Sequence, residues 1–221
     1  MRMMTMGVSG AVWVLLACTA MAQPAPDVKL PPSPIGQAAA QVGGTWSKTE
    51  QGGQRYEGGK WIVVDYSRPL LRGRTTIFGT GDQYGRQVMD GSPVWRAGAN
   101  ATTTLTTQVP LTVGGKTVPP GVYNVFVDLK PGNWTLILSN QERQAKYDPA
   151  DKVKLYGAAN YDPKFDVARV GMDVSERTDA TKREHPVEQF TITFLTVSPK
   201  MLMLRMEWES TVATAPIELG Q

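Results

Sequence analysis

The chain has 221 residues, of which 41% are hydrophobic and 19% charged, with 23 Lys and Arg against 20 Asp and Glu. Its single cysteine excludes an internal disulfide, a four-cysteine zinc site and an iron–sulfur cluster, and its single histidine excludes a His-rich metal site. The formal net charge of +3 is too small to argue for a nucleic-acid partner. These counts fit one or two domains with a hydrophobic core.

The first 22 residues have the pattern of a signal peptide. Arg2 precedes a short apolar run over residues 10–17, and Ala20 and Ala22 stand at the −3 and −1 positions of a cut before Gln23. The run is shorter than the roughly 20 residues that cross a bilayer, so no transmembrane segment is expected. The sequence therefore predicts export to the periplasm or the extracellular space.

Cys18 allows a second interpretation of the same segment. Residues 15–18 (LLAC) are similar to a bacterial lipobox, in which the cysteine is acylated and becomes the new N-terminus. Residues 23–44 are rich in Pro, Ala and Gly and lack periodic apolar spacing, so we expect a disordered linker or tether. An outer-membrane lipoprotein anchored at Cys18 is thus the alternative to a soluble exported protein, and the folded domain is expected over residues 45–221.

Apolar residues in this domain recur with a period of two, which is typical of β-strands. The glycine pair at 114–115 is suited to a two-residue hairpin turn, and no segment has a helical apolar stripe. The expected fold is all-β, a single antiparallel β-sandwich of the jelly-roll or Greek-key kind. The strand-like runs lie at 61–66, 102–109, 123–130, 134–138, 170–174, 190–194 and 202–208.

Several short motifs together resemble one known family. They are YSRP at 66–69, RGR at 72–74, IFG at 77–79, WRAGANAT at 95–102, GGKTVPPGVYNVF at 114–126 and PVEQFTITF at 186–194. The combination resembles the domain-of-unknown-function family 2911 (DUF2911), whose members are secreted or periplasmic bacterial proteins. The family has no established activity, so the resemblance implies a location and a fold. One departure is the polar segment 80–94, which is longer than the family pattern.

The candidate ligand site is a cluster of arginines beside glycine and proline turns. Guanidinium groups bind carboxylates, phosphates or sulfated sugars through paired hydrogen bonds. The alternative is structural, with the same groups fixing irregular loops through backbone carbonyls, Asp65 or Asp90. The candidate residues are Arg68, Arg72, Arg74, Trp95, Arg96 and Asn100.

The sequence offers few residues for sugar stacking, metal binding or catalysis. Trp134 and Trp208 alternate with aliphatic residues and are expected in the core, whereas Trp46, Trp61 and Trp95 border loops and could stack on sugar rings. The Asp-Pro steps after Tyr147 and Tyr161 are typical of turns and lack the spacing of a calcium loop. No metal site and no cofactor are expected, and no nucleophile elbow or phosphate loop is present.

The sequence thus favours a non-enzymatic binding module of the envelope or the extracellular space. Its expected partner is a glycan or an anionic small molecule, with no role for nucleic acid. Two alternatives stay open. One is a hydrolase or lyase that uses carboxylates and arginine, and the other is a structural or interaction module.

Overall fold

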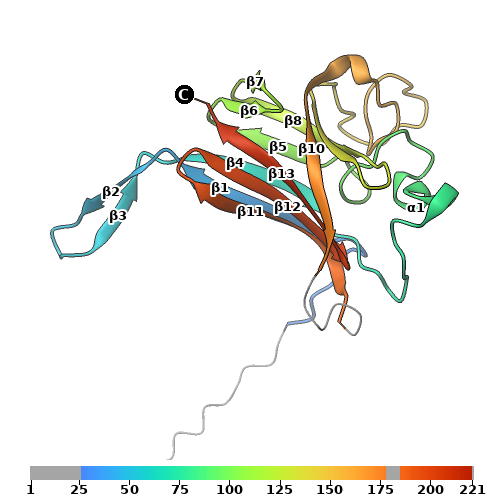
Figure 1. Ribbon diagram of the computed structural model, residues 1–221, viewed down its shortest axis with the longest axis horizontal. Helices are drawn as coiled ribbons and strands as arrows, with labels where there is room; N and C mark the ends of the chain where they lie inside the picture. The colour runs from blue at the N-terminus through green and yellow to red at the C-terminus, as the bar shows by residue number, and fades with distance from the viewer. Residues whose placement is uncertain (1–25, 178–184, 221) are drawn as a thin grey trace, which may run out of the picture.

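The computed structural model describes residues 26–177 and 185–220, so the predicted signal peptide and Cys18 lie outside the described residues. Strands are the main regular secondary structure of the described chain, with long loops at 68–103 and 140–165 (Figure 1). The one α-helix, α1 (Arg86–Met89), is four residues long, and no helix of the described residues could cross a bilayer. The strands are β1 (Ile35–Val42), β2 (Thr45–Lys48), β3 (Gln54–Glu57), β4 (Lys60–Ser67), β5 (Thr104–Thr107), β6 (Leu111–Val113), β7 (Lys116–Val118), β8 (Gly121–Asp128), β9 (Trp134–Ser139), β10 (Asp166–Glu176), β11 (Val187–Ser198), β12 (Met201–Glu209) and β13 (Thr211–Leu219).

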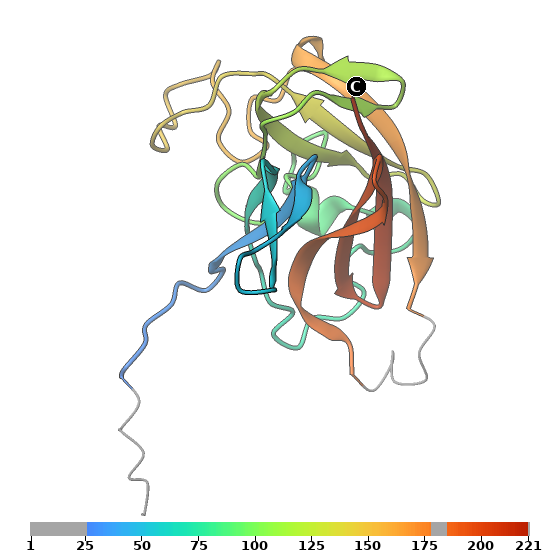
Figure 2. The same ribbon diagram turned by 90° about the vertical axis from the view of Figure 1, so that its left-hand side faces the viewer.

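Eleven strands form one continuous antiparallel sheet in the order β1-β4-β5-β8-β9-β10-β13-β12-β11, with β6 and β7 joined to β13. Strand β10 turns the corner, because its residues 166–172 pair with β9 and its residues 173–176 pair with β13. The sheet therefore curls into a flattened, nearly closed barrel (Figures 1 and 2). The all-β antiparallel class expected from the two-residue periodicity is confirmed.

Side chains close the gap between the two ends of this sheet. The Tyr66 hydroxyl, on β4, accepts a hydrogen bond from the Ile192 amide at 2.8 Å and lies 3.3 Å from the Ile192 carbonyl oxygen on β11. Beyond Tyr66 the chain itself pairs with β11 through an isolated bridge between Leu70 and Gln189. These contacts pair part of the edge of β11 with Tyr66 and with the chain that follows β4.

Strand β1 corrects the expectation of disorder over residues 23–44. Its eight residues pair in register with β4, from Ile35 opposite Ser67 to Val42 opposite Lys60. Ala38 and Val42 are buried against the core, while alternate positions face outward. The small alanine side chains conceal a strand pattern that larger apolar residues would have shown, because alanine is a weak signal for a strand.

The core is centred on aromatic side chains from distant segments. Phe78, Trp95, Trp134 and Trp208 are all buried, and the ring centroid of Phe78 lies 4.7 Å from Trp134 and 5.4 Å from Trp95. Such edge-on contacts add to the gain from burial itself. The expectation that Trp134 and Trp208 are core residues is confirmed.

Two hairpins complete the fold. The turn at Gly114 and Gly115 joins β6 to β7 as expected, with Val113 opposite Lys116 and positive φ at both glycines. Strands β2 and β3 form a separate two-stranded sheet that projects from the barrel as an arm (Figures 1 and 2).

Candidate functional site

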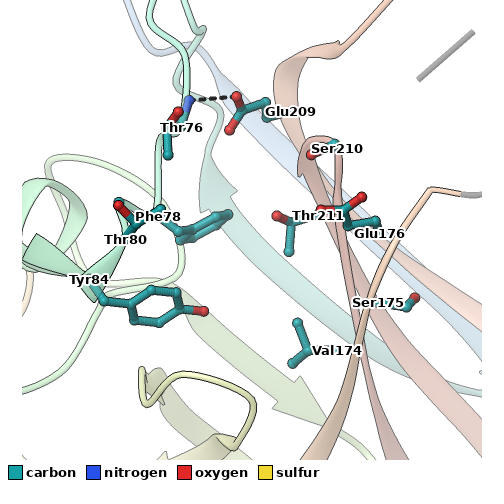
Figure 3. Close-up of a pocket in the computed structure, with 11 residues that line it drawn as sticks. Thr76, Phe78, Thr80, Tyr84, Val174, Ser175, Glu176, Glu209, Ser210 and Thr211 are labelled. Atoms are coloured by element: carbon teal, nitrogen blue, oxygen red, sulfur yellow. Dashed lines mark hydrogen bonds between the residues drawn. The ribbon is translucent and has the colours of Figure 1, made fainter. Parts of the chain in front are cut away.

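A pocket of about 400 Å³ opens at the end of the barrel opposite the arm. The arm joins β1 and β4 at Val42 and Lys60, whereas the pocket loop follows the other end of β4. Three segments far apart in the sequence meet there: the loop 76–84, the end of β10, and the turn between β12 and β13 (Figure 3). The lining residues are Thr76, Phe78, Gly79, Thr80, Tyr84, Val174, Ser175, Glu176, Glu209, Ser210 and Thr211.

Glu209 ties the loop to the β12–β13 turn. Its backbone has a positive φ of 56°, as a tight two-residue turn between Trp208 and Thr211 requires. Its carboxylate accepts hydrogen bonds from the backbone N–H groups of Thr76 at 2.6 Å and Ile77 at 2.9 Å. Because bonds to a charged acceptor are the stronger kind, this single side chain sets the position of the loop.

The loop itself is held in a tight conformation. Gly79 has a φ of 71°, and a Cβ atom there would lie 2.5 Å from the Gln83 carbonyl oxygen, so only glycine fits without strain. The Gly85 amide donates to the Phe78 carbonyl at 2.6 Å, which closes the loop on itself. Tyr84 is thereby directed back toward the barrel.

Two aromatic rings form one wall of the pocket. Phe78 rests on the buried tryptophans, and the Tyr84 hydroxyl accepts a hydrogen bond from Trp134 Nε1 at 2.6 Å. Both rings point across the pocket toward Thr211 and Val174 (Figure 3). The wall is therefore rigid and partly apolar.

Ser210 and Thr211 lie across the pocket from these rings, whereas Thr80 lies beside Phe78 and Ser175 points away (Figure 3). The hydroxyl groups of Thr80, Ser210 and Thr211 make no hydrogen bond to any described residue. Lys, Arg and His are missing from the described lining residues, and Glu209 supplies negative charge. An aromatic wall opposite hydroxyl groups suits a neutral ligand that carries its own hydroxyls more than it suits an anion.

The arginines predicted from the sequence lie elsewhere and bond mainly to backbone carbonyls. Arg68 donates through Nε to the Phe190 carbonyl at 3.3 Å and through Nη2 to Thr191 Oγ1 at 3.1 Å. Arg72 donates to the Pro32 carbonyl at 3.2 Å, and Arg74 to the Leu70 and Leu71 carbonyls at 2.6 and 3.0 Å. These contacts are those of the structural alternative. Arg68 also borders a mostly apolar hollow of about 450 Å³ with Leu30, Pro31, Pro34, Ile35 and Gln189.

The remaining predicted site residues gather around different neighbours. Arg96 and Asn100 meet at Gly157, where a Cβ atom would lie 3.1 Å from Arg96 Cδ and 2.8 Å from the Asn100 carbonyl oxygen. Arg96 Nη2 lies 4.0 Å from Asp90 Oδ2, and Arg96 Nε is buried with no partner among the described residues. Trp95 is only 1% exposed and is a core residue, which removes it as a surface for stacking a sugar ring.

The aspartates at the Asp-Pro step after Tyr147 stabilise a turn. Asp148 Oδ1 accepts from the Ala150 amide at 2.9 Å, and Asp151 Oδ1 accepts from the Val153 and Lys154 amides at 2.8 and 2.9 Å. These backbone donors hold the pKa of Asp151 below its usual value. No cluster of three His, Cys, Asp or Glu side chains suited to a metal ion occurs within residues 26–177 and 185–220.

The sequence did not predict the pocket at this end of the barrel, which is called the mouth pocket below. Its loop overlaps IFG at 77–79 and the long polar segment 80–94, and this departure from the family pattern was the one available signal. The positions on β10 and at the β12–β13 turn are ordinary strand-end residues in the sequence. Only the closure of the sheet brings them beside the loop.

Fold and pocket together define an all-β, barrel-like domain with a ligand-sized hollow at one end. The model of the family described as protein of unknown function (DUF2911) matches residues 47–217, and the chain belongs to this family. No curated protein and no solved structure matches the chain.

Proposed function

We propose that the protein binds a small, neutral, hydroxyl-bearing ligand, a mono- or disaccharide, in the pocket at the mouth of the barrel. The observation that carries the proposal is the rigid aromatic wall of Phe78 and Tyr84 opposite hydroxyl groups that make no hydrogen bond to any described residue. A sugar ring has an apolar face for the aromatic wall and hydroxyl groups that can bond to those opposite.

The charge of the pocket favours a neutral saccharide over the anionic small molecule that the sequence also suggested. An anion in the pocket would lie near Glu209 with no cation among the described lining residues, which would cost free energy. The arginines that could have held an anion make their hydrogen bonds outside the pocket, to the carbonyls of Phe190, Pro32, Leu70 and Leu71. The glycan alternative is therefore preferred to the anionic one.

Binding is proposed in preference to hydrolysis because of Glu209. A glycosidase needs two carboxyl groups facing the substrate, one of which transfers a proton. Both oxygens of Glu209 accept backbone hydrogen bonds that hold the loop in place. Protonating or moving this carboxylate would release the loop, so it serves the pocket better as a fixed brace.

Export is part of the same proposal. The signal-like segment over residues 1–22 would deliver the protein to the periplasm or the extracellular space, where saccharides are available. Acylation at Cys18 would instead hold it at the outer membrane. Metabolic labelling with a fatty-acid analogue distinguishes the two, because Cys18→Ser removes the label only from a lipoprotein.

Isothermal titration of the purified protein against a panel of mono- and disaccharides, with acetate, citrate and phosphate as anionic comparators, tests the proposal. We expect a neutral sugar to bind, and the double variant Thr80→Val/Thr211→Val to weaken its affinity about tenfold or more. The control Thr196→Val removes an exposed hydroxyl on β11, outside the pocket, and should leave the affinity unchanged. Tight binding of an anion with no response to any sugar would refute the proposal.

A further inference from the structure

The β2–β3 arm carries the most exposed aromatic side chain of the described residues. Trp46 is 68% exposed, and its partner across the arm is Tyr56, with ring centroids 5.2 Å apart and planes tilted by 53°. A large apolar ring left this open to water gains free energy when a flat apolar surface covers it.

The arm is held in place at its base, where it leaves the barrel. The Tyr56 hydroxyl accepts a hydrogen bond from the Gly44 amide at 2.8 Å. Its ring lies so close to Gly44 and Gly59 that a Cβ atom at either position would come within 2.5 or 2.7 Å of it. An isolated two-stranded hairpin is only marginally stable, so these contacts stabilise the arm and fix the Tyr56 ring against which Trp46 packs.

Polar side chains accompany the rings. Lys48 and Gln54 are paired in register two residues beyond Trp46 and Tyr56, so all four share one face of the arm, and both polar chains are exposed. On the opposite face Arg55 and Glu57 lie 3.2 Å apart and pair with each other. Residues 43–59 hold two basic and two acidic side chains, so the arm has no net charge.

The dimensions of the arm restrict its partner. Two strands of four residues cannot supply the roughly 800 Å² per side that a stable protein interface buries. The tip at residues 49–53 (TEQGG) is polar and contains Glu50, so it lacks the apolar and basic residues that insert into a bilayer. A linear chain of sugar rings needs only a stacking surface flanked by a few hydrogen-bonding groups.

From these observations we infer that the arm is a second binding site, which stacks one ring of a neutral polysaccharide on Trp46 while Lys48 and Gln54 contact its hydroxyl groups. The arm lies at the opposite end of the barrel from the pocket, so the inference does not depend on what the pocket binds. Together the two sites would hold a polymer at one end and a small sugar at the other.

Native affinity electrophoresis of the purified protein in gels containing hydroxyethyl cellulose, xylan or glucomannan tests the inference. We expect retardation by at least one of these polymers, and Trp46→Ala to weaken it about tenfold or more. Tyr147→Ala is the matched control, because Tyr147 is 56% exposed in a distant loop and its ring centroid lies 4.9 Å from that of Tyr156, with planes tilted by 47°. This variant should migrate like the parent protein.

Fluorescence gives a second measurement. The described tryptophans other than Trp46 and Trp61 are buried, so acrylamide should quench mainly the fluorescence of these two. Bound polymer should protect the Trp46 fluorescence from quenching, and this protection should be missing in Trp46→Ala. Retardation that survives Trp46→Ala would overturn the inference. So would capture by polygalacturonate alone that disappears in roughly 0.3 M salt, or Trp46-dependent binding to phosphatidylcholine vesicles without polysaccharide binding. Mutations in the pocket should leave all of these results unchanged.

Discussion

Removing the Glu209 carboxylate tests how the mouth pocket is assembled. Glu209→Ala deletes the acceptor of two backbone hydrogen bonds, at 2.6 Å from Thr76 and 2.9 Å from Ile77. Each charge-assisted bond contributes about 1.5–3 kcal/mol when shielded from water. Thr76 is exposed, so its amide regains a hydrogen bond to water in the variant. We therefore expect Glu209→Ala to lower the free energy of unfolding by about 2–3 kcal/mol, less than two fully shielded bonds would contribute.

The positive φ of Glu209 provides an internal comparison. Glu209→Gly removes the same carboxylate but relieves the left-handed backbone, so it should be about 1 kcal/mol more stable than Glu209→Ala. The expected order of unfolding free energy is parent protein, then glycine variant, then alanine variant. A chain of this size loses about 2–4 °C in Tm for each kcal/mol, so the alanine variant should melt about 5–10 °C lower.

Urea unfolding followed by tryptophan fluorescence measures these differences, since the buried tryptophans surround Phe78. Glu218→Ala is the control, because Glu218 is exposed on β13 and its side chain pairs with no described residue. A loss below about 0.5 kcal/mol for Glu209→Ala would show that the loop is held by its own packing and would refute the bracing role.

Three further changes test other parts of the fold. Tyr66→Phe should lower the unfolding free energy by about 1–3 kcal/mol and speed hydrogen exchange at the Ile192 amide, because its hydroxyl bridges the sheet ends; unchanged exchange would contradict this. Gly114→Ala should cost more than about 2 kcal/mol by thermal melting, because a Cβ atom would come within 1.9 Å of the Arg169 carbonyl oxygen at a φ of 57°. Burial raises the pKa of Asp166 above its usual value, so the folded state holds this proton more tightly than the unfolded state, and stability from this group falls as pH rises through the acid range. Asp166→Asn should remove that part of the slope above the usual aspartate pKa in urea unfolding, and an unchanged slope would assign it to other carboxyl groups.

The fold class and much of the core were predictable because strand alternation is a local property. Trp134, Leu136 and Leu138 stand at alternate positions of β9 and are buried on one face, as the pattern predicts. Ile137 is buried on the other face with Phe126 and Leu155, which alternation alone does not indicate. The turn at Gly114 and Gly115 was equally local, since both positions require positive φ. Strand β1 escaped prediction because its alanines contribute little to that pattern.

The arginines show the limit of such reasoning. Their neighbours in sequence, glycine and proline, indicated turns correctly, but the pattern could not tell a ligand from a backbone carbonyl as the acceptor. The acceptors of Arg68 are the Phe190 carbonyl and the Thr191 hydroxyl, more than 120 residues away. That separation is set by closure of the sheet and leaves no trace near Arg68 in the sequence.

The sequence by itself determined seven of the thirteen described strands and the turn at Gly114 and Gly115, because each depends on residues within a few positions of one another. Tertiary structure decided which strand ends meet. The pocket exists because Glu209, on the last hairpin, reaches the backbone of Thr76 across 133 positions. Trp95 is core and Trp46 is surface for the same reason: burial depends on the whole closed sheet, whereas both tryptophans border loops in the sequence.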